Sequence, residues 1–160
     1  MLQPNALEVL DTETNLLWLY NWGISSTRDW NGAKNWAAGL TLAGAAAGEW
    51  RLPEADEYLD LETRLGFSLG QLQLHFINVQ TNVGNYWLGT EFAQDPNKAW
   101  YFQISPSLHV PGVIDKDFDF LHAVAVRAGP VATAVPEPQT LALALMALAA
   151  AAVAGRRRPA

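Results

Sequence analysis

Residues 85–104, NYWLGTEFAQDPNKAWYFQI, say more about the fold class than any other stretch of this sequence. Residues 85–90 and 99–104 are rich in aromatic and aliphatic side chains, which is typical of β-strands. The sequence DPN at 95–97 lies between them and favours a tight turn. The stretch therefore predicts two consecutive strands, and AVAVR at 123–127 predicts another.

Two helices are expected ahead of these strands. The first begins at Asp29, whose side chain can cap the free N–H groups of a first helical turn. One face of this helix then carries apolar residues, namely Trp30, Ala33, Trp36, Ala37 and Leu40. The second helix opens near Pro53, a favoured first-turn residue, and ends at Gly66.

Strands are also predicted near the start of the chain. Residues 7–10 and 16–20 are mostly apolar, and DTETN at 11–15 has turn chemistry. With helices early and most strands late, the fold class is predicted to be α+β, with two helices packed on short antiparallel strands.

The seven tryptophans all lie before residue 101. Trp50, Trp87 and Trp100 each fall within a patterned element, so they are expected in the core. Arg51 and Arg127 are expected to pair with buried carboxylates such as Glu91, because a buried arginine is rarely left unpaired.

Charge and composition limit the class of partner. The chain has a net charge of −6, but seven Lys/Arg against fifteen Asp/Glu give residues 1–135 a charge of −8. So acidic a domain argues against nucleic acid and anionic membranes, and weakens the case for polyanionic glycans. There is no cysteine, which excludes disulfides, thiolate metal sites and cysteine nucleophiles.

The last part of the sequence has an unusual order. Val135, Pro136, Glu137 and Pro138 precede an apolar run at 141–155, and Arg156, Arg157 and Arg158 follow it. As a helix the run would span roughly 22 Å, against about 30 Å of bilayer hydrocarbon. The run is therefore a marginal permanent membrane anchor and suits a temporary membrane stop. The arginines are expected on the cytoplasmic side of the membrane. A core helix and a retained tail anchor remain as alternatives.

This order resembles the PEP-CTERM sorting signal, which exosortase-type membrane proteases recognise in Gram-negative bacteria that make extracellular polysaccharide. The resemblance implies an exported protein held briefly in the inner membrane through residues 141–155. Processing near residues 135–138 would then deliver it to the cell surface or the extracellular matrix. The resemblance also predicts a secretion signal, which residues 1–20 do not provide, so Met1 is interpreted as a misplaced start.

The preceding part resembles the bacterial C-terminal domain of a collagen-like adhesin, a family of uncharacterised function, over residues 7–129. The blocks that carry the resemblance are DTETNLLWL (11–19), Trp30 with WAAGL (36–40), EWRLP (49–53), YWLGTE (86–91), AWYF (99–102) and AVAVR (123–127). The resemblance implies a C-type-lectin-like fold and a secreted binding or surface module. The adhesin binds sulfated glycans, and the acidic charge here departs from it.

Three segments are therefore expected. Residues 1–130 form one C-type-lectin-like domain, and residues 131–138 form a linker that contains the VPEP sequence. Residues 139–160 form the sorting segment, a transmembrane helix followed by a basic tail.

Two groups of residues are candidates for ligand binding. Trp22 and Asn21 lie in an apparent loop, where an exposed indole could stack on a sugar ring. Asp115, Asp117 and Asp119 alternate as in the start of an EF-hand loop, but Phe120 stands where that loop needs glycine. A calcium site of another type is the alternative to an ordinary solvated loop, and no other cofactor is expected.

Catalysis is not expected. GFSLG at 66–70 matches the G-x-S-x-G nucleophile motif, but that motif needs a strand before it and a helix precedes it here. His75, His109 and His122 show no metal-ligand spacing. We expect a non-enzymatic surface or matrix protein that contacts glycan; the alternative is a purely structural envelope protein without a small ligand.

Overall fold

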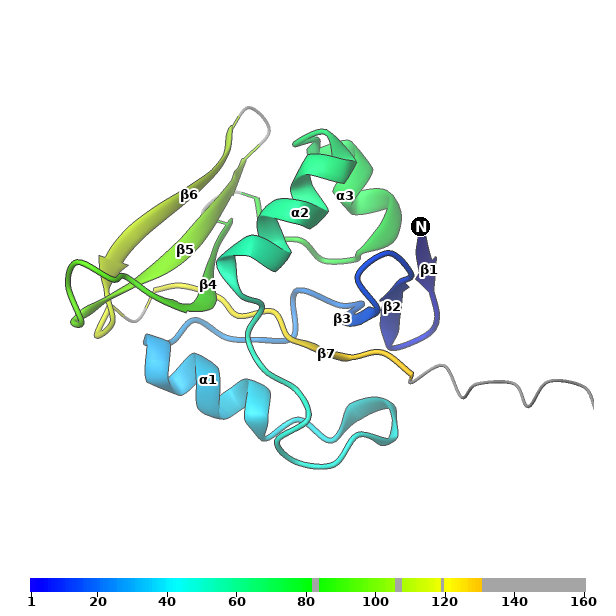
Figure 1. The fold of residues 1–160 in the computed structure, drawn as a ribbon, viewed down its shortest axis with the longest axis horizontal. Helices are drawn as coiled ribbons and strands as arrows, with labels where there is room; N and C mark the ends of the chain where they lie inside the picture. The colour runs from blue at the N-terminus through cyan, green and yellow to red at the C-terminus, as the bar shows by residue number, and fades with distance from the viewer. Residues whose placement is uncertain (82–83, 106–107, 119, 131–160) are drawn as a thin grey trace, which may run out of the picture. The chain divides into compact units, whose positions relative to one another are not determined.

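The computed structural model describes residues 1–81, 84–105, 108–118 and 120–130 (Figure 1). Residues Met1–Gly129 form one compact unit. In the described part, three α-helices accompany two small antiparallel sheets, so the predicted α+β class is confirmed.

The first sheet has the strand order β1-β2-β3-β7. Its strands are β1 (Leu2–Pro4), β2 (Glu8–Asp11), β3 (Leu16–Leu19) and β7 (Val126–Ala128). The β2–β3 hairpin and its turn were predicted, and Asn15 closes that turn with a φ of 54°. Asparagine tolerates this left-handed conformation better than most residues.

The second sheet has the order β4-β5-β6. Its strands are β4 (Gly84–Glu91), β5 (Lys98–Ser105) and β6 (Leu108–Asp115). The predicted turn is present, because the Asp95 Oδ1 accepts a hydrogen bond from the Asn97 N–H at 3.0 Å. The strand β6 was not predicted, since its sequence LHVPGVID contains a proline and a glycine that usually interrupt strands.

The helices are α1 (Trp30–Ala38), α2 (Ala55–Leu65) and α3 (Leu69–His75), with a short 3-10 turn at Leu42–Gly44. As predicted, Asp29 caps α1 by accepting a hydrogen bond from the Gly32 N–H at 2.6 Å. A capping box of Glu54 and Glu57 starts α2, and Gly66 ends it in the left-handed conformation. The short helix α3 was not predicted.

Residues 121–126 connect the two sheets. Their carbonyl groups accept hydrogen bonds of 2.9 to 3.0 Å from the N–H groups of Arg28, Trp87, Leu19 and Arg51. In Figure 1 this segment runs as a yellow strip between the sheets into β7. The predicted strand at 123–127 is therefore extended and buried, but its regular pairing with β3 begins only at Val126.

Aromatic rings fill the core. Trp18, Trp22, Trp50 and Trp87 are fully buried, which confirms the prediction for Trp50 and Trp87. Trp100 is half-buried and packs against the core. Burial of this region also raises the pKa of Tyr86 to about 12.

Both arginines form ion pairs as predicted, but with carboxylates other than that of Glu91. Arg127 binds the buried carboxylate of Glu8 at 2.8 Å, and Arg51 binds Glu57 at 2.6 Å. Glu91 instead pairs with Lys116 at 3.0 Å, so the prediction was wrong for Glu91. The reason is that β4 ends beside Lys116, whereas Arg127 lies on β7 and its side chain reaches past β3 to Glu8 on β2.

Among the described residues, no helix is long and apolar enough to cross a membrane. The predicted apolar segment at 141–155 and the sorting residues at 135–138 and 156–158 lie outside the described residues. The expected linker and terminal helix therefore stay predictions.

Candidate functional site

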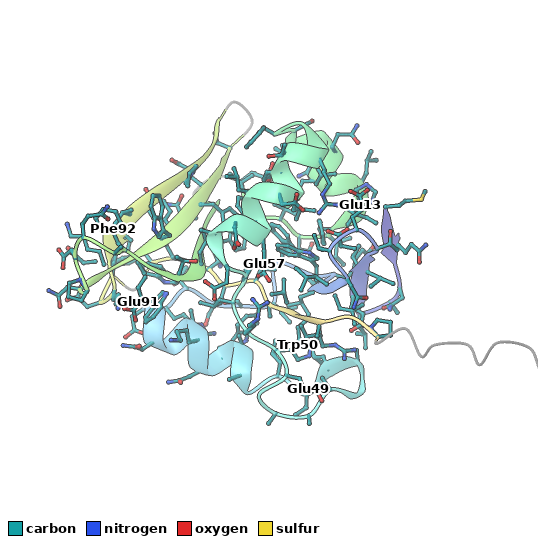
Figure 2. The ribbon with its side chains drawn as sticks, viewed as in Figure 1. Glu13, Glu49, Trp50, Glu57, Glu91 and Phe92 are labelled. Carbon is teal, nitrogen blue, oxygen red and sulfur yellow. The ribbon has the colours of Figure 1, made fainter. Side chains whose placement is uncertain are left out.

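A polar cavity of about 470 Å³ lies where α1 begins. The start of α1, the β4–β5 turn and the end of β6 meet at this cavity, which we call the loop cavity. Its walls are formed by Asp29, Asn31, Pro96, Asn97, Asp115, Lys116 and Asp117. Figure 2 shows the labelled Glu91 and Phe92 at this end of the molecule, where β4 ends.

Hydrogen bonds of the backbone hold the walls of the loop cavity together. The Trp30 N–H donates to the Lys116 carbonyl at 2.9 Å, and the Lys116 N–H donates to the Asn97 carbonyl at 2.8 Å. The Trp30 indole N–H also donates to the Leu88 carbonyl at 2.8 Å. The three walls are thus fixed before any ligand arrives, which lowers the entropic cost of binding.

The loop cavity is acidic. It contains the carboxylates of Asp29, Asp115 and Asp117 and a single ammonium group, that of Lys116. The Lys116 Nζ lies 3.0 Å from Glu91, which compensates its charge. Sulfate and carboxylate groups would meet repulsion here, whereas ligand hydroxyl groups can donate hydrogen bonds to the aspartates.

An exposed aromatic pair follows the lining residue Asp117 in the chain. Phe118 and Phe120 are 37% and 67% exposed, and their ring centroids lie 5.3 Å apart. Rings this exposed are unusual for phenylalanine, because burial of such a side chain normally stabilises the fold. The pair supplies an apolar surface next to polar groups in the chain, a combination found at many ligand sites.

A second cavity, of about 340 Å³, lies along α1 and the segment that connects α1 to α2. We call it the connector cavity, and it is lined by Lys34, Asn35, Ala38, Gly48, Trp50, Arg51, Leu52, Glu54 and Gly89. Figure 2 shows the labelled Glu49 and Trp50 in this connecting segment, near the end of α1.

Charges at the connector cavity are partly compensated. Arg51 donates two hydrogen bonds to the Glu57 carboxylate, at 2.7 and 2.6 Å. Burial alone would raise the pKa of Glu57, but these bonds and one from the Glu54 N–H lower it. The Lys34 Nζ lies 4.1 Å from the centre of the Trp30 ring, which attracts the cation.

The structure contradicts the predicted role of Trp22. Its side chain is fully buried and packs 4.7 Å from the Phe76 ring, so it cannot stack on a sugar. The Asn21 Oδ1 accepts hydrogen bonds from the Gly23 N–H and the Asn78 amide. The predicted loop is thus closed by residues 77–78 and faces the core, which the local sequence did not reveal.

The three aspartates of the predicted calcium site are only partly described. Asp115 and Asp117 line the loop cavity, and Asp119 lies outside the described residues. In the ranges that are described, no group of three or more His, Asp or Glu residues could hold a metal ion. Calcium binding therefore stays a prediction.

The GFSLG motif is a helix junction. Gly66 ends α2, and the Ser68 hydroxyl accepts a hydrogen bond from the Gln71 N–H as the cap of α3. No strand precedes Ser68, so the strand–turn–helix geometry of a nucleophile elbow is not formed here.

Sequence reasoning missed the cavity residues Asn31, Lys34, Asn35 and Asn97, and it missed the exposed pair Phe118 and Phe120. The sequence could have pointed to the phenylalanines, since they alternate with aspartates in DKDFDF at 115–120 and belong to no predicted strand. The amides had no such signal, because their meeting at a cavity depends on how α1 packs against β4 of the second sheet.

Comparisons with known proteins place this architecture in a family. The family described as the Lcl C-terminal domain matches residues 7–124, and the PEP-CTERM protein-sorting motif matches residues 134–158. No curated protein and no solved structure matches the chain. The predicted C-type-lectin-like likeness is therefore not confirmed.

The sorting motif indicates an exported protein that exosortase processes and directs to the cell surface or the extracellular space. The domain match covers most of the described residues, including both cavities and the first four residues, 121–124, of the segment that connects the sheets. The chain belongs to the Lcl C-terminal domain family and carries a PEP-CTERM protein-sorting motif after that domain.

Proposed function

We propose that this protein is a non-enzymatic module of the cell surface or extracellular polysaccharide matrix, which binds uncharged glycan at the loop cavity. Exosortase-type processing near residues 135–138 would release it from a transient membrane stop at residues 141–155. The PEP-CTERM motif supports this destination, because it is a sorting signal for exported proteins.

The observation that carries the glycan proposal is the loop cavity with the neighbouring Phe118–Phe120 pair. Carboxylates and amides can bind sugar hydroxyls, and the exposed rings can cover the apolar face of a sugar. The excess of aspartates in the cavity, together with the charge of −8 over residues 1–135, favours an uncharged ligand over a sulfated one.

The fold proposal that goes with this function is a C-type-lectin-like domain. The α+β class and the two small antiparallel sheets support it. Ser68 caps α3, and this arrangement supports a role without a serine nucleophile. A purely structural matrix protein is the rival function, favoured by the dense aromatic core.

A glycan array tests the proposal on the full chain, purified in detergent, with and without calcium. We expect binding to neutral glycans and weaker or no binding to sulfated ones. The variant with Phe118→Ser and Phe120→Ser should lose roughly tenfold in affinity, because the apolar surface is removed.

Phe67→Ser serves as the matched control, since Phe67 is an exposed aromatic residue, at 46%, away from the loop cavity. Its binding should equal that of the wild type. Absence of binding across neutral, acidic and sulfated sugars would favour the structural role instead. Binding that requires calcium would identify a metal site among the aspartates.

A further inference from the structure

The outward face of α1 links the two cavities. Asn31 lines the loop cavity, whereas Lys34, Asn35 and Ala38 line the connector cavity. All four residues are exposed. Their spacing of three, four and seven residues places them in one stripe along the helix, which we call the α1 stripe.

The α1 stripe is longer than one sugar ring. Seven residues of α-helix rise by roughly 10 Å from Asn31 to Ala38, and each cavity extends beyond one end. In Figure 2 the labelled Glu91 lies near the start of α1, and the labelled Trp50 lies near its end. A ligand that reaches both cavities must therefore be an extended chain.

The side chains of the α1 stripe have hydrogen-bonding capacity to spare. In the described part of the chain, the amides of Asn31 and Asn35 donate to no protein group and accept from none. Lys34 rests on the Trp30 ring and has no described carboxylate within ion-pair distance. Amide and ammonium donors and amide acceptors suit the hydroxyl groups of a polymer.

We propose that the loop cavity, the α1 stripe and the connector cavity form one continuous binding path for a linear, uncharged polysaccharide. The loop cavity holds the primary sugar subsite beside the aromatic pair, and the connector cavity holds a secondary subsite. This inference rests on the proposed glycan-binding function and adds the class of ligand, a polymer rather than a single sugar.

An extended peptide fits the path less well. Peptide recognition of this kind usually uses an open sheet edge or apolar side-chain pockets. The α1 stripe is a helix surface, and the lining of the loop cavity is dominated by charged and amide groups. Binding of a polar peptide in place of sugars is therefore an outcome that would overturn the proposal.

The test measures affinity by calorimetry for the full chain in detergent. The probes are uncharged linear glucose, mannose and galactose oligomers, as disaccharides and octasaccharides, and a polar peptide of octasaccharide length. We expect the octasaccharide of at least one series to bind on the order of a hundredfold more tightly than its disaccharide, because the second subsite is engaged intramolecularly.

Single substitutions separate the subsites. Asn31→Ala should weaken the disaccharide and the octasaccharide alike, by roughly three- to tenfold. Asn35→Ala should weaken the octasaccharide to a similar extent and leave the disaccharide unchanged. Both changes place alanine on an exposed helix surface, where it favours the helix, so folding should be retained.

Gln73→Ala is the matched control, because Gln73 is an exposed amide on α3, away from both cavities. Equal affinity for disaccharide and octasaccharide, or an unchanged octasaccharide affinity in Asn35→Ala, overturns the path but leaves glycan binding intact. If no oligosaccharide binds, or if only the peptide does, both the path and the proposed function fail.

Discussion

Trp30 is the residue on which the geometry of the loop cavity depends most. It is 3% exposed, and its indole N–H and backbone N–H reach β4 and the end of β6 respectively. The ammonium groups of Lys34 and Lys116 lie 4.1 and 4.4 Å from its ring centre. One side chain therefore ties α1 to the second sheet and orients two of the cations.

The ion pair between Asp11 and Arg64 makes a pH-dependent contribution to stability that can be argued for a single residue. The Asp11 side chain is fully buried and accepts two hydrogen bonds from Arg64 and one from Thr14 at 2.8 Å. Burial alone would raise the pKa of Asp11, but these bonds outweigh it and hold the pKa below its ordinary value of 3.8.

We predict that Asp11→Asn lowers the free energy of unfolding at neutral pH by roughly 1.5 to 3 kcal/mol, because a charge-assisted bond is lost. The folded-state pKa is depressed, so the wild-type advantage is fully present above the unfolded pKa of about 3.9. It is lost as the pH falls through the folded-state value. Urea denaturation between neutral pH and about pH 2 measures this difference.

Asp60→Asn is the control for the Asp11 prediction. Asp60 also pairs with Arg64, at 2.8 Å, but its side chain is 49% exposed. Its replacement should cost less than about 1 kcal/mol. A wild-type advantage over Asp11→Asn that stays constant down to low pH would show that the charge of Asp11 contributes nothing.

At the scale of elements, β6 is an edge strand of the second sheet, since in the described part of the chain it pairs only with β5. The hydrogen bond from the Lys116 N–H to the Asn97 carbonyl continues the register of the β5–β6 pair. Alternate residues of β6 therefore direct their backbone N–H and C=O groups toward β5. Pro111 and Val113 belong to the other set of residues, whose backbone polar groups face away from β5. Pro111 has no N–H, so it blocks the pairing of another strand at the middle of this edge.

We predict that Pro111→Thr restores an outward N–H and makes the protein associate through β6. Static light scattering should show a molecular mass that rises with concentration, whereas the wild type keeps its mass. Pro96→Ala is the matched control, because Pro96 is exposed in the β4–β5 turn and outside the strand. If Pro111→Thr leaves the scattering unchanged, the other residues of β6 are sufficient to prevent strand pairing between molecules.

At the scale of the whole molecule, the chain joins an acidic domain to a basic sorting segment. Residues 1–135 carry a charge of −8, and three arginines follow the apolar run. The sorting motif matches at residues 134–158, beyond the compact unit that ends at Gly129. The sorting motif and the proposed ligand site therefore lie in different parts of the chain.

We predict that replacing Pro136 and Pro138 together by alanine prevents processing. Alanine lets a helix extend through residues 135–138, whereas proline interrupts it and leaves an extended segment for the protease. The variant should keep its full mass and stay in the membrane fraction, as mass spectrometry of fractionated cells would show. Pro130→Ala should be processed normally, and normal processing of the double variant would contradict the prediction.

Local sequence patterns were sufficient for elements whose signals lie within a few residues. The cap at Asp29, the β2–β3 turn, the strands β4 and β5 and the end of α2 at Gly66 were all predicted. The helix α3 was missed because a helix of one or two turns has too little periodicity to detect.

The sequence alone determined the α+β class, the membership of the family and the sorting motif, because composition, turn chemistry and short motifs are local properties. Only the tertiary structure decided that Trp22 is buried, that Glu91 pairs with Lys116, and that Asn31 and Asn35 belong to one surface. The physical reason is that burial and ion pairing depend on which distant segments pack together. Residues 121–126 set that packing by bonding to both sheets at once.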